Sequence, residues 1–172
     1  MVIIKLVGMA LIFLSSSAIG FCVGESYCTR QRELVNMADA VEMMSTEVMY
    51  TSDSLKLVIE SITPNVRGIC KEFFDCILEQ IRLDTPLKTA WENAIELNAL
   101  AMSLKKSDKA YLINSSHLLT AYELDDQRKR LEELKEKIGY LADEALEEKN
   151  KNSRLVKLLG VYGGALLCVI IF

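Results

Sequence analysis

The sequence predicts an all-α fold, with two transmembrane helices flanking a cytoplasmic helical domain that contains an antiparallel two-helix stalk. Three observations predict it. Apolar runs occupy both ends of the 172-residue chain. The middle repeats apolar residues at helical spacing, and no segment shows the alternation typical of a β-strand. The expected division is a transmembrane helix at 2–24, the helical domain at 25–154 and a second transmembrane helix at 155–172.

The first apolar run, residues 6–24, contains 19 residues without a charge. At about 1.5 Å per residue such a helix nearly matches a hydrocarbon core of about 30 Å. The alternative is a cleaved signal peptide, because small residues lie at 15–18. The apolar run continues beyond them to Gly24, which favours a retained span.

The second apolar run, residues 155–172, is shorter and includes Lys157, whose ammonium group can snorkel to the interface. Basic residues flank both runs on the side of the middle segment: Arg30, Arg32, Lys149, Lys151 and Arg154. Because cytoplasmic flanks carry the excess of Lys and Arg, the middle segment is expected in the cytoplasm.

The middle segment is acidic, with 18 basic against 24 acidic residues, a net charge of −6. This balance gives no support to nucleic-acid binding. The five cysteines show neither a disulfide framework nor metal-site spacing. At about 130 residues, the segment is long enough for one domain with its own core.

The stalk is predicted from two apolar seams with the three-and-four spacing of coiled coils. The first comprises Leu34, Met37, Val41, Met44 and Val48. The second comprises Leu131, Leu134, Ile138 and Leu141. The first leaves the membrane and the second returns to it, so the two helices are antiparallel.

Shorter helices are expected between the seams. Thr63-Pro64 and Thr85-Pro86 each combine a capping hydroxyl with a proline suited to the first helical position. Further starts are expected at TSDS (51–54) and SLKKSD (103–108). Trp91, the only tryptophan, is a possible partner surface, although its apolar helix face favours a core anchor.

Catalytic motifs are missing from the sequence. His117 is the one histidine, and no phosphate-binding loop, nucleophile elbow or zinc-protease motif occurs. We therefore expect no enzyme, no cofactor, no metal site and no small-molecule substrate.

Small residues recur every four positions in both apolar runs. Ser16, Gly20 and Gly24 form such a face on the first, and Gly160 and Gly164 on the second. These faces allow helices to approach closely in lipid. Counting from the membrane boundary, we expect Gly24 near Gly160 and Gly20 near Gly164. Alternatively, these faces contact other proteins of a complex.

The chain resembles the stage III sporulation protein AB family over essentially its whole length. The matching features are LVG (6–8), GF (20–21), the Arg30/Arg32 region, EVMY (47–50), Leu87-x-x-Ala90-Trp91 and the LGVxGG pattern at 159–164. One departure is DSL at 53–55, where the family usually has Thr-Pro-Leu. Asp retains the capping function, so the helix start is preserved.

The resemblance implies a helical domain similar to the inner-membrane platform (F) proteins of type II secretion and type IV pilus machines. It also implies a place in the mother-cell membrane facing the forespore, within a secretion-like channel complex. The implied partners are a secretion-type ATPase and other stage III sporulation proteins. The expected function is a non-enzymatic membrane platform coupled to that ATPase; the alternative is a coiled-coil membrane sensor or adaptor.

Overall fold

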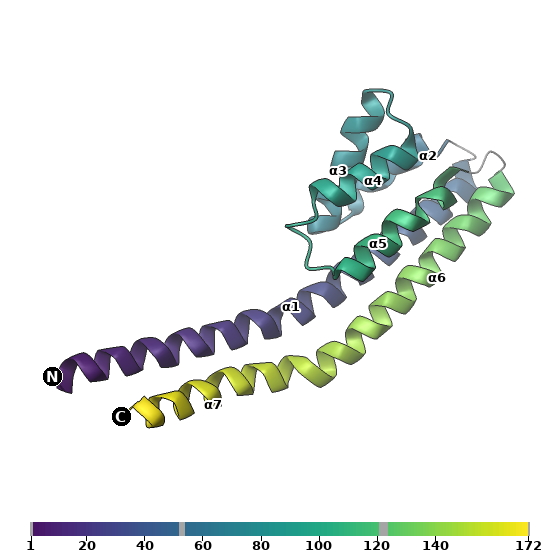
Figure 1. Ribbon diagram of the computed structural model, residues 1–172. Coiled ribbons are helices and arrows are strands. Elements are labelled where there is room, and N and C mark those ends of the chain that lie inside the picture. Colours follow the sequence, from purple (N-terminus) through teal and green to yellow (C-terminus); the bar gives the residue numbers. More distant parts are fainter. Residues whose placement is uncertain (1, 52–53, 121–123, 172) are drawn as a thin grey trace. The chain divides into compact units, whose positions relative to one another are not determined.

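The computed structural model describes residues 2–51, 54–120 and 124–171, and within these ranges every regular element is helical. The longest helices are α1 (Val2–Thr51), α6 (Leu124–Glu148) and α7 (Arg154–Ile171) (Figure 1). Four short helices lie between α1 and α6 in the sequence: α2 (Leu55–Ile62), α3 (Ile69–Arg82), α4 (Leu87–Leu97) and α5 (Lys106–Asn114). The connecting turns are η1 (Thr63–Asn65), η2 (Ser115–Thr120) and η3 (Lys149–Ser153). The predicted all-α class is confirmed.

The chain forms two compact units. We call Met1–Gln31 with Glu144–Phe172 the hairpin unit, and Arg32–Asp143 the helical unit. The boundaries fall inside α1 and α6, beyond the ends of the apolar runs. Two long helical stretches, Val7–Tyr50 and Asp125–Ile170, each contain a window apolar enough to cross a membrane. The flanking candidate membrane helices therefore agree with the predicted architecture.

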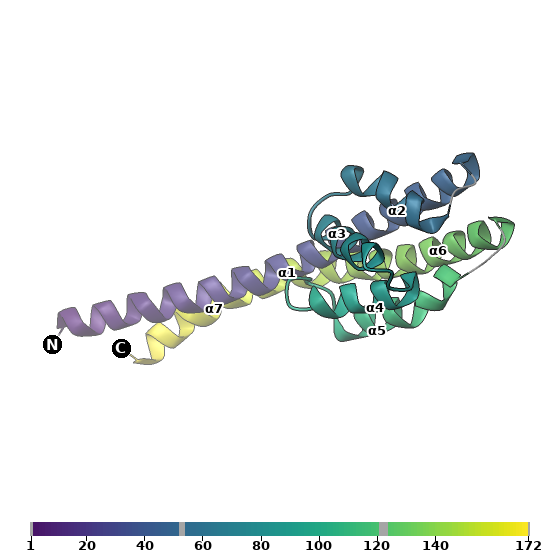
Figure 2. The ribbon, with the colours of Figure 1, turned by 90° about the horizontal axis from the view of Figure 1, so that it is seen from above.

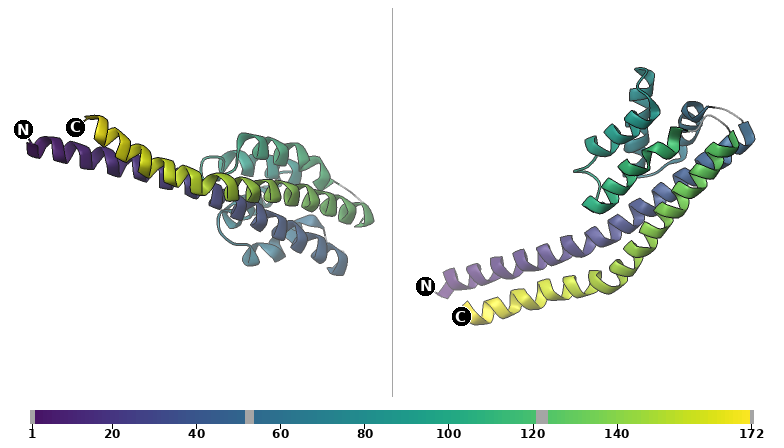
Figure 3. Two further views of the ribbon diagram at one scale, coloured as in Figure 1. Left: turned by 90° about the horizontal axis from the view of Figure 1, so that it is seen from below. Right: turned by 45° about the vertical axis from the view of Figure 1, so that its right-hand side comes forward.

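In the helical unit, residues 32–51 of α1 and 124–143 of α6 lie side by side and antiparallel (Figures 1 and 3). Lys135 Nζ lies 2.9 Å from Glu42 Oε1 across this pair. The following seam residues are buried: Leu34, Met37, Val41, Met44, Val48, Leu131, Leu134 and Ile138. The two helices thus place their apolar stripes in the core of this unit.

Leu141 departs from the predicted seam. It is only partly buried, and Ala142 is buried instead. The next buried residue after Ile138 on α6 is therefore Ala142, four positions later, and not Leu141, three positions later. Spacing of 11 residues from Leu131 to Ala142 matches 3.67 residues per turn, which follows a straight α-helix more closely than a heptad does.

The four short helices lie on one side of the α1/α6 pair (Figures 1 and 3). Figure 2 shows α3 and α4 between α2 and α5. Trp91 on α4 is fully buried, and its ring centroid lies 4.8 Å from that of Phe73 on α3. Its indole Nε1 donates a hydrogen bond of 3.1 Å to the carbonyl of Leu112. The partner-surface hypothesis for Trp91 is therefore wrong, and the core-anchor alternative is confirmed.

The predicted helix starts are partly wrong. Thr63-Pro64 begins the short turn η1, and α3 starts later, at Ile69. Gly68 precedes α3 with φ of +62°, a left-handed conformation that favours glycine. Pro86 is the N-cap of α4 rather than its first residue. Of the TSDS segment, residues 52–53 lie outside the described ranges, and Ser54 is the N-cap of α2.

Asp108 has a capping role at the start of α5. This helix begins at Lys106, and the side chain of Asp108 accepts a 3.0 Å hydrogen bond from the backbone N–H of Lys105. The carboxylate therefore acts from the third helical position and reaches back to the N-cap, as in a capping box.

Candidate functional site

The hairpin unit pairs α1 with α7 through glycine. Gly20 faces Gly160, and a Cβ built on either residue would lie 2.7 Å from the Cα of the other. No side chain fits at such a distance from backbone atoms, so this approach requires glycine on both helices. Close backbone contact of this kind stabilises helix pairs in lipid, where no hydrophobic effect drives association.

The close contact continues along the hairpin on one side of this glycine pair. Gly164 faces Ser16, whose Cβ lies 3.1 Å from a Cβ built at position 164. The Ser16 hydroxyl donates a 2.8 Å hydrogen bond to the carbonyl of Gly160. Further along, Cys168 Sγ lies 3.3 Å from the carbonyl oxygen of Met9. The structure therefore brings Ser16, Gly20, Gly160 and Gly164 together in one interface.

The expected register of this interface is wrong by about one helical turn. Gly24 does not face Gly160, since a Cβ at Gly24 would lie 2.6 Å from Lys157 Cγ and 3.0 Å from the carbonyl oxygen of Ser153. The prediction counted residues from the ends of the apolar runs, but both helices continue past those ends. The return helix also contains the π-turn η3, whose wider turn accommodates an extra residue.

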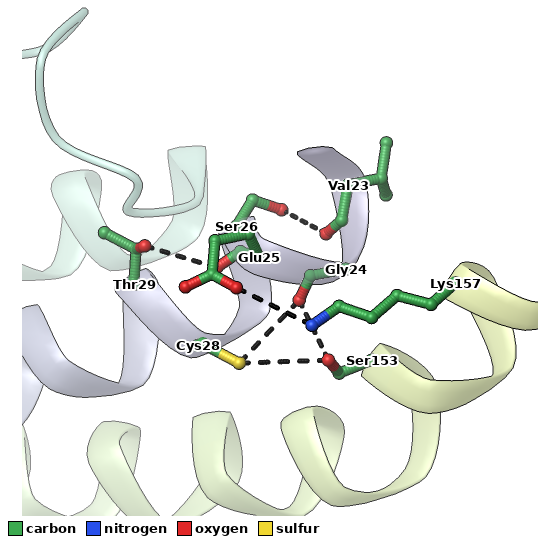
Figure 4. Close-up of polar contacts among 8 residues, drawn as sticks. All are labelled: Val23, Gly24, Glu25, Ser26, Cys28, Thr29, Ser153 and Lys157. Atoms are coloured by element: carbon green, nitrogen blue, oxygen red, sulfur yellow. Dashed lines mark hydrogen bonds and ion pairs between the residues drawn. The ribbon is translucent and has the colours of Figure 1, made fainter. Parts of the chain in front are cut away.

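A polar cluster lies at this end of the paired apolar helices (Figure 4). The buried Ser153 hydroxyl donates a 2.9 Å hydrogen bond to the carbonyl of Gly24 and lies 3.8 Å from Cys28 Sγ. Lys157 Nζ lies 3.6 Å from Glu25 Oε2. Sequence analysis missed Ser153. Extending the small-residue repeat from Gly24 to Cys28 indicates that the close approach continues past the apolar run.

Arg30 forms a second polar contact across the hairpin unit. Its buried guanidinium donates from Nη1 to Glu148 Oε2 at 2.8 Å, and Nη2 lies 3.8 Å from Glu144 Oε1. Beside it, Lys149 Nζ donates to Gln31 Oε1 at 3.2 Å. Because the guanidinium is buried, removing its carboxylate partners would leave its charge uncompensated. Arg30 therefore helps to hold the two helices of the hairpin unit together.

The site is built for helix packing. Among the described residues no group of three or more His, Cys, Asp or Glu is arranged to hold a metal ion. His117 is exposed, and its Nδ1 lies 2.7 Å from the carbonyl oxygen of Asn114. The expectations of no enzymatic activity and no cofactor remain predictions from the sequence.

A sequence model of the family described as stage III sporulation protein AB matches residues 5–172. The chain belongs to the stage III sporulation protein AB family. It is 24% identical over 169 residues to Stage III sporulation protein AB of Bacillus subtilis (strain 168), covering 98% of this chain and 99% of that protein. The resemblance identified from the sequence motifs is thereby confirmed, and the protein has a role in sporulation.

A solved structure of stage III sporulation protein AB (SpoIIIAB) has the same fold. It superposes with a TM-score of 0.64 at 20% identity, over 72% of this chain and 98% of the solved chain.

Proposed function

We propose that this family member is a non-enzymatic membrane platform in a sporulation complex, where it couples a secretion-type ATPase to the rest of the assembly. The observation that carries the proposal is the glycine-mediated pairing of two apolar helices within one chain. That arrangement suits a membrane anchor that presents the helical unit to partners. Family membership supports other stage III sporulation proteins as those partners.

We place the segments 2–24 and 155–172 in the membrane and 25–154 in the cytoplasm, at the mother-cell membrane that faces the forespore. The basic residues between the two runs support this orientation. A reporter cysteine at Asp125, which is exposed at the start of α6, tests it in a Cys-free background. An impermeant maleimide should label this position only after lysis; labelling of intact cells contradicts the orientation.

The ATPase coupling is tested by purification from sporulating cells. A tagged full-length chain is extracted in mild detergent, and the co-purifying proteins are identified by mass spectrometry. The expected result is recovery of an ATPase that an untagged strain does not yield. Recovery of the chain without any ATPase contradicts the proposal and favours the alternative of a coiled-coil sensor or adaptor.

The alternative role for the small-residue faces is contact with other members of the complex. The intrachain pair Gly20/Gly160 favours the hairpin over this alternative, because each glycine already meets the other's backbone. Cross-linking of positions 16 and 164, described below, separates the two.

A further inference from the structure

The return helix of the hairpin unit, residues 144–171, meets α1 along one face. Glu144 and Glu148 lie beside Arg30, and the Ser153 hydroxyl donates to the carbonyl of Gly24 (Figure 4). Successive members of this α1-facing stripe are three or four residues apart, except that Ser153 follows Glu148 by five. In chain order, the stripe comprises Glu144, Glu148, Ser153, Lys157, Gly160, Gly164 and Cys168.

A regular α-helix cannot keep two positions five residues apart on one face. At about 100° per residue, a step of five rotates the side chain by about 140° from its starting direction, and a step of four by only about 40°. The π-turn η3 (149–153) occupies the step from Glu148 to Ser153 and takes in one residue more than an α-turn does. A step of four there would keep the rest of the stripe in phase, so η3 holds one residue that packing against α1 does not require.

The α7 side of η3 is held against α1 by backbone contact. A Cβ built on Gly20 or Gly160 would lie 2.7 Å from the Cα of the other residue. A gap of about 1 Å already forfeits up to roughly half of the dispersion energy of such a contact. Ser153 adds the 2.9 Å hydrogen bond to Gly24. This side therefore tolerates little separation of the two helices.

The other side of η3 is held by long side chains. Arg30 has two carboxylate partners one helical turn apart, Glu148 at 2.8 Å and Glu144 at 3.8 Å. Lys149, the first residue of η3, donates to Gln31 at 3.2 Å. These side chains have several rotatable bonds, so the contacts can persist while the two backbones move apart or together. This side therefore tolerates movement that the glycine side does not.

We propose that η3 is a joint in the hairpin unit. Bending at η3 moves residues 144–148 toward and away from α1, while α7 stays packed on α1 through the glycine contact. Helices bend at π-turns, and these turns occur frequently at functional sites. Arg30 limits the movement, because its buried guanidinium needs a carboxylate partner. The proposal concerns the hairpin unit alone and does not depend on an ATPase partner.

Hydrogen–deuterium exchange of the full chain in detergent micelles, with all five native cysteines retained, tests the joint. Amides of residues 149–153 should exchange about tenfold faster than those of 144–148, because the π-turn opens locally at a lower free energy. Deletion of Asn150, which is exposed, restores a step of four and should abolish this difference. Asn150→Ala is the matched control, because it keeps the length and should keep the fast exchange. Equal exchange of the two segments in the wild type overturns the proposal.

The deletion variant also needs an intact glycine contact. In a Cys-free background, the disulfide between Ser16→Cys and Gly164→Cys should form within one chain with or without Asn150. Loss of this disulfide on deletion overturns the proposal, because the extra residue is then required for packing rather than for bending.

Distances between spin labels test the movement itself, by double electron–electron resonance on the Cys-free full chain in nanodiscs. One label pair, at Ser26 and Glu147, spans the hairpin on the Arg30 side of η3. The control pair, at Ser15 and Tyr162, spans the glycine-paired part, and all four side chains are exposed. The Ser26/Glu147 distribution should be about twice as wide as the control and should narrow when Asn150 is deleted. Two distributions of equal width overturn the proposal, since movement is then either absent or shared by α7.

Discussion

Glu33 illustrates how burial changes a residue that the sequence would place on a solvated face. It lies beside Arg32 on α1, yet it is buried and accepts the N–H of Ser103 at 2.9 Å. Burial raises the pKa of this carboxyl above its ordinary value, and the Ser103 hydrogen bond and the charges of Lys109 and Arg32 oppose that rise. Through this hydrogen bond the carboxyl holds the backbone of the α4–α5 connection against α1.

Replacing Glu33 by Gln should make the protein less sensitive to pH. A carboxyl whose pKa is raised on folding binds its proton more tightly in the folded state, so wild-type stability falls as pH rises through the unfolded and folded pKa values. Gln keeps an acceptor for Ser103 without the charge. Glu33→Gln should therefore gain stability relative to wild type between about pH 4 and pH 8.

The measurement is denaturant unfolding of the full chain in detergent, followed by far-UV circular dichroism at pH 4, 6 and 8. Glu136→Gln, at an exposed position on α6, is the control and should show no such trend. A wild-type advantage over Glu33→Gln that grows with pH would show that the charged form is the stabilised one.

Cys70 should be inert as a nucleophile in the folded protein. Burial, with smaller contributions from the charges of Glu33 and Asp39, raises the pKa of its thiol to about 12. At pH 8 only about one molecule in 10,000 then carries the reactive thiolate. Iodoacetamide at pH 8, followed by peptide mass spectrometry, should modify Cys76 on the same helix and leave Cys70 unmodified until urea is added. Equal native rates would contradict the burial of Cys70.

At the scale of elements, the pairing of α1 with α7 depends on the contact between Gly20 and Gly160, where there is no space for a side chain. Gly160→Leu should destabilise their pairing by about 1–3 kcal/mol or more, because the new side chain meets the backbone of Gly20. Gly163→Leu is the matched control, since a Cβ there has no neighbour within 4 Å. Unfolding in mixed micelles with increasing SDS measures the difference. Equal midpoints for the two variants would argue against the close pairing.

The α1/α6 pair of the helical unit depends on its buried seams. Leu134→Asp places a carboxylate in the core of the helical unit. It should lower the free energy of unfolding by more than a core Leu→Ala change, which typically costs about 2–5 kcal/mol. Tyr140→Asp, at an exposed position of the same helix, should have little effect. Denaturant unfolding of both variants tests this. Similar losses would mean that α6 presents no distinct buried face.

At the scale of the whole molecule, the two ends of the chain should be joined within one protomer. Ser16→Cys with Gly164→Cys should form a disulfide in a Cys-free background. The two Cβ positions lie 3.1 Å apart, so the helices need to separate by only a few tenths of an ångström to reach the Cβ–Cβ distance of about 3.5–4.5 Å found in disulfides. Ser16→Cys with Gly163→Cys is the control pair. Non-reducing gel electrophoresis should show a cross-linked monomer. Cross-linked dimers alone would assign the small-residue faces to contacts between chains.

The sequence by itself determined the helical class, the seam residues from Leu34 to Val48 and the small-residue faces of the apolar runs. These follow from the periodicity of single helices, in which burial repeats every 3.6 residues. The tertiary structure decided that Gly20 meets Gly160, that Gly24 meets Ser153 and that Ala142 replaces Leu141. It also decided the burial of Glu33 and Arg30. Periodicity shows which face of a helix is apolar, but the register between helices more than 100 residues apart depends on how their side chains and backbones fit.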